Sequence, residues 1–235
     1  EPGEPADAIR KTRIEVNLAA GKADFGRGFT AVAPPRPPGP VAHRVRDFLL
    51  AAEALGAKPF TADHFAPVRQ GAEPPRHSIA LVPDSDLGPS HQWPAERWIE
   101  VGRELTDCCH LRPTIIGPGP IADALAAVLA DAADHNCPAS PGERLEVFSR
   151  HRFVVAADGT APHLASHAGA TCLTLFGPND PNWRRPLGKR HQVLRRHVEC
   201  APCRLARCPL DHRCMRELET VTVLAALAKM LDPDS

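Results

Sequence analysis

Hydrophobic and polar positions follow a regular pattern only in the later two thirds of the chain. Before residue 65, one segment has a clear helical period: residues 41–55 predict an amphipathic helix. Residues 12–18, TRIEVNL, suit a strand. Residues 33–40, APPRPPGP, suit neither a helix nor a central strand, because proline lacks the amide hydrogen that both need. The predicted helix places these residues on one face: Val41, Val45, Phe48, Leu49, Ala52 and Leu55.

From residue 78 onward, short buried strands alternate with helices. This alternation predicts an α/β fold, a Rossmann-like parallel sheet with helices on both faces. A proline-rich stretch, residues 66–77, precedes it and is predicted to be a linker. The predicted strands are 78–83, 113–116, 153–157, 171–176 and 191–194, and the predicted helices are 94–106, 121–133, 142–149, 162–168 and 220–231.

Composition narrows the class of protein. Hydrophobic residues make up 43% and charged residues 24% of the 235 positions, which predicts a folded core rather than disorder. Lys+Arg and Asp+Glu both total 28, so no net field attracts nucleic acid. No apolar run approaches the roughly 20 residues of a membrane span. The chain opens with a polar segment rather than a signal peptide, and we expect a cytoplasmic location.

The most informative segment runs from residue 153 to residue 181. It places Asp158, Gly159 and Thr160 at the end of a buried strand and the start of a helix. Free backbone N–H groups at such a position favour a phosphate-bearing ligand. We therefore expect the amides of Thr160 and Ala161, with the Thr160 hydroxyl, to contact a diphosphate.

Each of these side chains also has a purely structural alternative. Thr160 can act as the N-cap of the helix that follows it. Asp158 either binds hydroxyl groups of a ligand or braces its loop. His163 lies one turn into the predicted helix, and it either reaches the ligand or packs against the sheet.

Four of the eight cysteines crowd into one short segment. Thiolates at this spacing can hold a structural zinc ion, but the segment lacks the paired C-x2-C knuckles of common zinc ribbons. Reduced thiols packed in a loop, disulfides and an iron–sulfur cluster are the alternatives. The four residues are Cys200, Cys203, Cys208 and Cys214.

Four segments together resemble bacterial glycosyltransferase family 9, the lipopolysaccharide heptosyltransferases and their relatives. They are VPDSDLGPSHQWPAERW (82–98), AADGTAPHLASHAGA (156–170), LFGPNDP (175–181) and ECAPCRLARCPLDHRC (199–214). The resemblance extends over residues 78–231. It implies a GT-B enzyme of two Rossmann-like halves, in which residues 78–232 form the C-terminal, donor-binding half and residues 1–65 a remnant of the acceptor half.

The resemblance also implies the chemistry. A sugar would pass with inversion from an ADP-sugar to a cell-envelope glycolipid of the lipopolysaccharide core type, and catalysis would require no cofactor. The glycolipid would bring the protein into peripheral contact with the inner membrane. The catalytic base is expected outside this chain. The alternatives are another GT-B enzyme, such as a nucleotide-sugar epimerase, and a non-catalytic interaction module organised by a Cys/His metal site.

By the same resemblance, four further residues belong to the donor site: Ser90, His91, Gly177 and Pro178. His91 stands where the family has a lysine, and a histidine is only partly charged at neutral pH. It would therefore bind a diphosphate weakly. Asp123 is a candidate ribose ligand. Residues 184–190 form a basic loop that would meet a phosphate or simply be solvated.

Overall fold

The computed structural model describes residues 43–54, 57–58, 60–69 and 71–232, and the chain divides into two compact units between His64 and Phe65. In the first unit the described helix is α2, Val45–Ala54, which lies within the predicted segment 41–55. The strand predicted at 12–18 and the proline-rich segment 33–40 lie outside the described residues.

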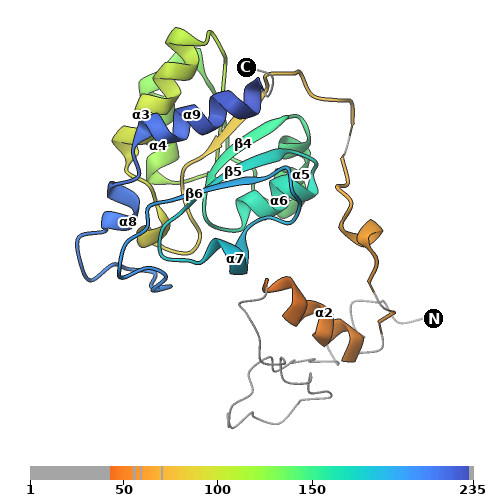
Figure 1. Cartoon of the computed structure of the whole chain (residues 1–235). Coiled ribbons are helices and arrows are strands. Elements are labelled where there is room, and N and C mark those ends of the chain that lie inside the picture. The colour runs from red at the N-terminus through yellow and green to blue at the C-terminus, as the bar shows by residue number, and fades with distance from the viewer. Residues whose placement is uncertain (1–42, 55–56, 59, 70, 233–235) are drawn as a thin grey trace, which may run out of the picture. The chain divides into compact units, whose positions relative to one another are not determined.

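The second unit is built on a parallel sheet of six strands in the order β3-β2-β1-β4-β5-β6 (Figure 1). The predicted α/β, Rossmann-like class is therefore confirmed. The strands are β1 Ile79–Val82, β2 Thr114–Ile116, β3 Asp134–Asn136, β4 Phe153–Ala157, β5 Thr171–Phe176 and β6 Gln192–Arg195.

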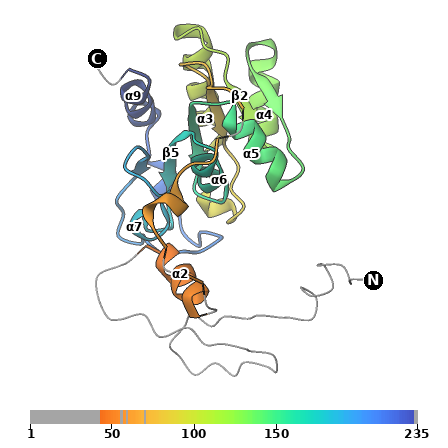
Figure 2. The same ribbon diagram turned by 90° about the vertical axis from the view of Figure 1, so that its right-hand side faces the viewer.

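Helices cover both faces of the sheet, as Figures 1 and 2 show. The side chains of β1 alternate, so that Leu81 joins one apolar cluster and Ala80 the other. The first cluster contains residues of α3, α4 and α9, and the second contains residues of α5 and α6. These helices are α3 Ala95–Arg103, α4 Pro120–Leu129, α5 Pro141–Ser149, α6 Ala161–His167 and α9 Thr220–Leu231.

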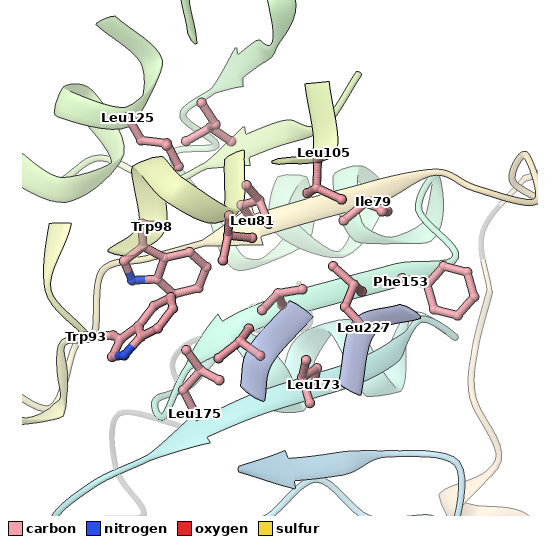
Figure 3. Packing of buried hydrophobic residues seen from close by; sticks show 14 of the residues in the cluster. Ile79, Leu81, Trp93, Trp98, Leu105, Leu125, Phe153, Leu173, Leu175 and Leu227 are labelled. Carbon is pink, nitrogen blue, oxygen red and sulfur yellow. The ribbon is translucent and has the colours of Figure 1, made fainter. Parts of the chain in front are cut away.

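The larger cluster contains two tryptophans (Figure 3). The rings of Trp93 and Trp98 meet edge to face with their centroids 5.5 Å apart, and both side chains are fully buried. The Trp93 indole N–H donates to the carbonyl oxygen of Leu218 at 2.9 Å. This bond fixes the start of the C-terminal segment against the loop after β1.

Three short elements were not predicted. Strand β3 is polar and exposed at the edge of the sheet, so it lacks the hydrophobic run that marks a buried strand. Helices α7, Pro181–Arg184, and α8, Arg213–Arg216, are single turns within predicted loops. The predicted helix 94–106 is also divided, because α3 continues as a π-helical turn over Glu104–Cys108.

The segment predicted as a linker is attached to the second unit. The Arg69 guanidinium donates to the carbonyl oxygens of Ser149 and Gly169 at 3.1 and 2.6 Å. The Val68 amide donates to the carbonyl oxygen of His167 at 2.7 Å. In the part of the chain that the structure describes, no helix has the length and apolarity to cross a membrane.

Candidate functional site

The direction of the chain across the sheet reverses between β1 and β4. From β1 the chain moves outward to β2 and β3, and then returns to β4 and continues to β5 and β6. In open α/β sheets, ligands bind at such a switch point, beyond the carboxyl ends of the strands. Here those ends carry the loops 83–91, after β1, and 158–160, after β4.

Asp158, the first residue after β4, connects three loops. Its Oδ2 accepts a hydrogen bond from Asn179 Nδ2 at 2.5 Å and lies 3.3 Å from His91 Nδ1. Its carbonyl oxygen accepts from Ser85 Oγ at 2.6 Å. The side chain is 1% exposed, and its Oδ1 has no hydrogen-bond partner among the described residues. In this conformation Asp158 braces the loops, and its role as a ligand residue stays a prediction.

His91 is equally enclosed. It ends a single 3₁₀ turn, Pro89–His91, and is 2% exposed. Its Nδ1 faces the Asp158 carboxylate rather than solvent. Contact between His91 Nδ1 and a phosphate would therefore require the ring to leave Asp158.

Asp86 occupies two of the three donors that the sequence assigns to a diphosphate, both of them on Thr160. Its Oδ1 accepts from the Thr160 backbone N–H at 2.9 Å, and its Oδ2 accepts from the Thr160 hydroxyl. Partial burial raises the pKa of Asp86, but the two hydrogen bonds from Thr160 outweigh it and hold the pKa below its usual value. Thr160 is the N-cap residue of α6, as the sequence suggested, but its hydroxyl makes no capping bond and donates to Asp86 instead.

A second unpredicted carboxylate, Asp84, binds the first turn of α4. It accepts from the amides of Ala122 at 2.8 Å and Ile121 at 3.3 Å, and from Gln92 Nε2 at 3.2 Å. The sequence contained a clue to both residues, since Asp84 and Asp86 directly follow a buried strand. No periodic pattern in the sequence, however, indicates which distant backbone amides a carboxylate in a loop will bind.

Ser90 is bound to the cysteine segment, which we define as residues 199–214. Its amide donates to the carbonyl oxygen of Ala206 at 3.1 Å, and its hydroxyl donates to that of Leu205. Its own carbonyl oxygen lies 2.8 Å from His212 Nε2. Ser90 is 3% exposed, so its expected contact with a donor would require this segment to move.

The cysteine segment also holds the turn after β5. A Cβ on Gly177 would lie 2.6 Å from Met215 Sδ, so a larger residue there would require the Met215 side chain of α8 to shift. The carbonyl oxygen of Pro178 accepts from the Arg204 amide at 2.9 Å. Gly177 and Pro178 thus have a packing role, and their approach to a nucleotide stays a prediction.

The four cysteines of this segment are free thiols. Cys214 is buried, and the other three are half-buried or exposed. Burial, and then the charges of Cys200, Cys203 and Cys208, raise the pKa of Cys214 to about 11. No group of three or more His, Cys, Asp or Glu side chains within the described ranges is arranged to hold a metal ion. The structure therefore does not assemble the predicted zinc ligands.

The other candidate residues lie around the same edge. His163 is half-buried, and its charge contributes to lowering the pKa of His191. Gly159 packs against Asp86, because a Cβ there would lie 2.5 Å from Asp86 Oδ1. Asp123 is exposed, with its Oδ1 3.9 Å from His135 Nε2.

Comparisons with known proteins agree with this fold. The model of glycosyltransferase family 9 (heptosyltransferase) matches residues 50–213. The chain resembles E. coli ADP-heptose LPS heptosyltransferase II at 20% identity and a TM-score of 0.56, over 68% of this chain and 47% of that one. It also resembles E. coli heptosyltransferase WaaC with ADP, at 20% identity and a TM-score of 0.56, over 81% of this chain and 58% of that one.

A third similar structure is the family 9 glycosyl transferase from Veillonella parvula, at 16% identity and a TM-score of 0.64, over 82% of this chain and 60% of that one. At these identities the likeness shows the fold. The chain corresponds to about half the length of these proteins. No curated protein sequence matches it significantly.

Proposed function

This chain belongs to glycosyltransferase family 9, and we propose that it contributes the donor site of an inverting, heptosyltransferase-like enzyme. The observation that carries the proposal is Asp158, which joins the loops after β1, β4 and β5 at the switch point of the sheet. A single buried carboxylate that holds three loops together at this place supports a preorganised ligand site.

The proposed donor is an ADP-sugar, and heptose is the proposed sugar. The similar structure is that of E. coli heptosyltransferase WaaC with ADP, which supports adenine as the base. Residues 78–232 would bind the donor, and residues 1–65 would belong to the acceptor half. The proposed donor contacts are the residues predicted above: Ser90, His91, Asp158, Gly159, Thr160, Ala161, His163, Gly177 and Pro178.

In the proposed reaction, a hydroxyl oxygen of the acceptor forms a bond to the anomeric carbon. The bond between that carbon and the diphosphate oxygen breaks, and the hydroxyl proton passes to a general base. Negative charge grows on the departing diphosphate, so hydrogen-bond donors that face it lower the barrier. The proposal requires no cofactor.

The proposed acceptor is a cell-envelope glycolipid of the lipopolysaccharide core type. Such an acceptor would place the enzyme in the cytoplasm, in peripheral contact with the inner membrane. An assay of the full-length protein with donor alone, and then with donor and acceptor, tests the transfer. A transferase releases ADP faster with the acceptor, whereas an epimerase converts the donor sugar with no acceptor present.

Nucleotide binding to this chain tests the donor site directly. Thermal unfolding is measured with ADP, UDP and GDP, and ADP is expected to stabilise the fold by about 2.7 kcal/mol at a hundredfold excess over its Kd. Asp158→Ala is expected to lose this stabilisation, while Asp131→Asn, an exposed acid far from the switch point, keeps it. If none of the nucleotides changes the unfolding of the wild-type chain, the proposal is wrong.

The alternative of a metal-organised interaction module predicts a different result. Purified protein would then contain one equivalent of zinc, and a chelator would lower its stability whether or not nucleotide is present. Metal analysis together with the ADP experiment separates these two functions.

A further inference from the structure

Both hydrogen-bond donors of Thr160 are already engaged by Asp86. The backbone N–H and the hydroxyl donate to different oxygens of the same carboxylate, and the first of these bonds is 2.9 Å long. The carboxylate also lies directly against Gly159, since a Cβ at that glycine would be 2.5 Å from Asp86 Oδ1. An anion from within the chain thus fills the position where a ligand anion would bind.

The position lies at the switch point, between β1, which precedes Asp86, and β4, which precedes Thr160. The groups around this position favour one negative charge there, but not two. Arg144 of α5 is the positive charge that acts on Asp86. Asp84, two residues away, is a second carboxylate whose oxygens bind the start of α4. A phosphate placed at Thr160 beside Asp86 would meet a like charge and would find both Thr160 donors already engaged.

We propose that Asp86 competes with a phosphate of the nucleotide-sugar for the Thr160 donors and so determines the affinity for the donor. The proposal deepens the proposed function and rests on it. When a diphosphate binds, the Asp86 carboxylate leaves Thr160, and its two hydrogen bonds are replaced by bonds to phosphate oxygens. Like charges in close contact cost several kcal/mol, so removal of the Asp86 charge is expected to favour the phosphate.

Isothermal titration with ADP and with adenosine tests this competition, because the two ligands differ only in the diphosphate. Asp86→Ala is expected to bind ADP at least about 10-fold more tightly than the wild type, equivalent to about 1.4 kcal/mol. Asp86→Asn, which is isosteric, is expected to change ADP affinity in the same direction by less. Adenosine affinity is expected to be the same in all three proteins.

The control is Asp131→Asn. It removes an exposed carboxylate without touching Thr160. An equal gain in ADP affinity in this variant would mean that net charge alone is responsible, and would overturn the inference. Melting temperatures of all the variants show that each one is folded.

The remaining outcomes separate the inference from the proposed function. If the wild type binds ADP and Asp86→Ala binds it no more tightly, the competition does not exist, although the donor site does. If ADP binds to Asp86→Ala alone, the competition is strong and the inference is supported. If ADP binds to none of the proteins, the proposed function and the inference are both wrong.

Discussion

His212 Nε2 lies 2.8 Å from the carbonyl oxygen of Ser90, and this hydrogen bond joins two segments that are 122 residues apart. Together with the bonds from Ser90 to Leu205 and Ala206, it places the cysteine segment across the loop after β1. A loop of few apolar contacts is thereby held at the edge where the donor is proposed to bind.

The bond from His212 is expected to stabilise the cysteine segment. His212→Ala should lower the free energy of unfolding by about 1 kcal/mol, since it leaves the buried Ser90 with one partner fewer. Amide hydrogen exchange over residues 199–212 should become faster than in the wild type. His197→Ala, whose ring contacts only the exposed Arg195 among the described hydrogen bonds, serves as the control and should leave exchange unchanged.

Gly88 is expected to tolerate no side chain. It has a φ of 110°, and a Cβ would lie 2.7 Å from the carbonyl oxygen of Ala206. Gly117 has a similar φ of 127° but no atom within 4 Å of its Cβ position. Gly88→Ala and Gly117→Ala therefore share the backbone strain, and only the first also clashes. Urea unfolding should show Gly88→Ala to be less stable than Gly117→Ala by at least about 1 kcal/mol. Equal losses would contradict the close approach.

The two buried tryptophans form a matched pair for a hydrogen-bond test. Trp93 donates to Leu218, whereas Trp98 Nε1 is buried without a partner among the described residues. Replacement by phenylalanine reduces the volume equally in both cases. Trp93→Phe leaves the Leu218 carbonyl unsatisfied and should cost about 1 kcal/mol more than Trp98→Phe in denaturant unfolding. The reverse order would contradict the assigned bond.

His191 should make the fold sensitive to mild acid. Burial, then the charge of Arg190, lowers its pKa to about 4, and its Nδ1 accepts from the Cys172 amide at 3.1 Å. The unfolded chain takes up a proton at this residue near pH 6.5 and the folded chain does not. Stability is therefore complete above pH 6.5 and falls as the pH decreases toward 4, by on the order of 2 kcal/mol.

The measurement is the free energy of unfolding against pH for the wild type and for His191→Gln. The variant should be less stable at pH 7 but lose less stability between pH 6.5 and pH 4. His151 is a second buried histidine whose pKa burial lowers, so some of the slope should persist in the variant. If the free energy of unfolding depends on pH equally in the variant and the wild type, His191 is not the source of the acid sensitivity.

Asp86 should stabilise the fold although it weakens binding of the nucleotide-sugar donor. Its folded pKa lies below the usual value, so its contribution is present above the unfolded pKa and is lost as the pH falls through the folded pKa. At neutral pH, Asp86→Asn is expected to lower the free energy of unfolding by about 1 kcal/mol. Asp123→Asn should not. A variant that gained stability would show that the Thr160 bonds do not outweigh the cost of burying the Asp86 carboxylate.

The sequence by itself determined the elements whose side chains repeat with a clear period. The bounds of β4, β5 and α9 are those predicted, because β4 and β5 are buried apolar runs and the buried residues of α9 repeat with a helical period. Strand β3 was missed since an exposed edge strand needs no such run. The four motifs, taken together in their order, also sufficed to indicate the family that the match to residues 50–213 shows.

Only the tertiary structure decided which donors and acceptors form hydrogen bonds with one another at the switch point. Asp86 and Thr160 are 74 residues apart, and Asp158 and His91 are 67 apart. No local pattern records such pairs, because they form only when separate strands bring their carboxyl ends to one edge of the sheet. The sequence therefore placed hydrogen-bond donors at Thr160, and the packing of the loops supplied the carboxylate that occupies them.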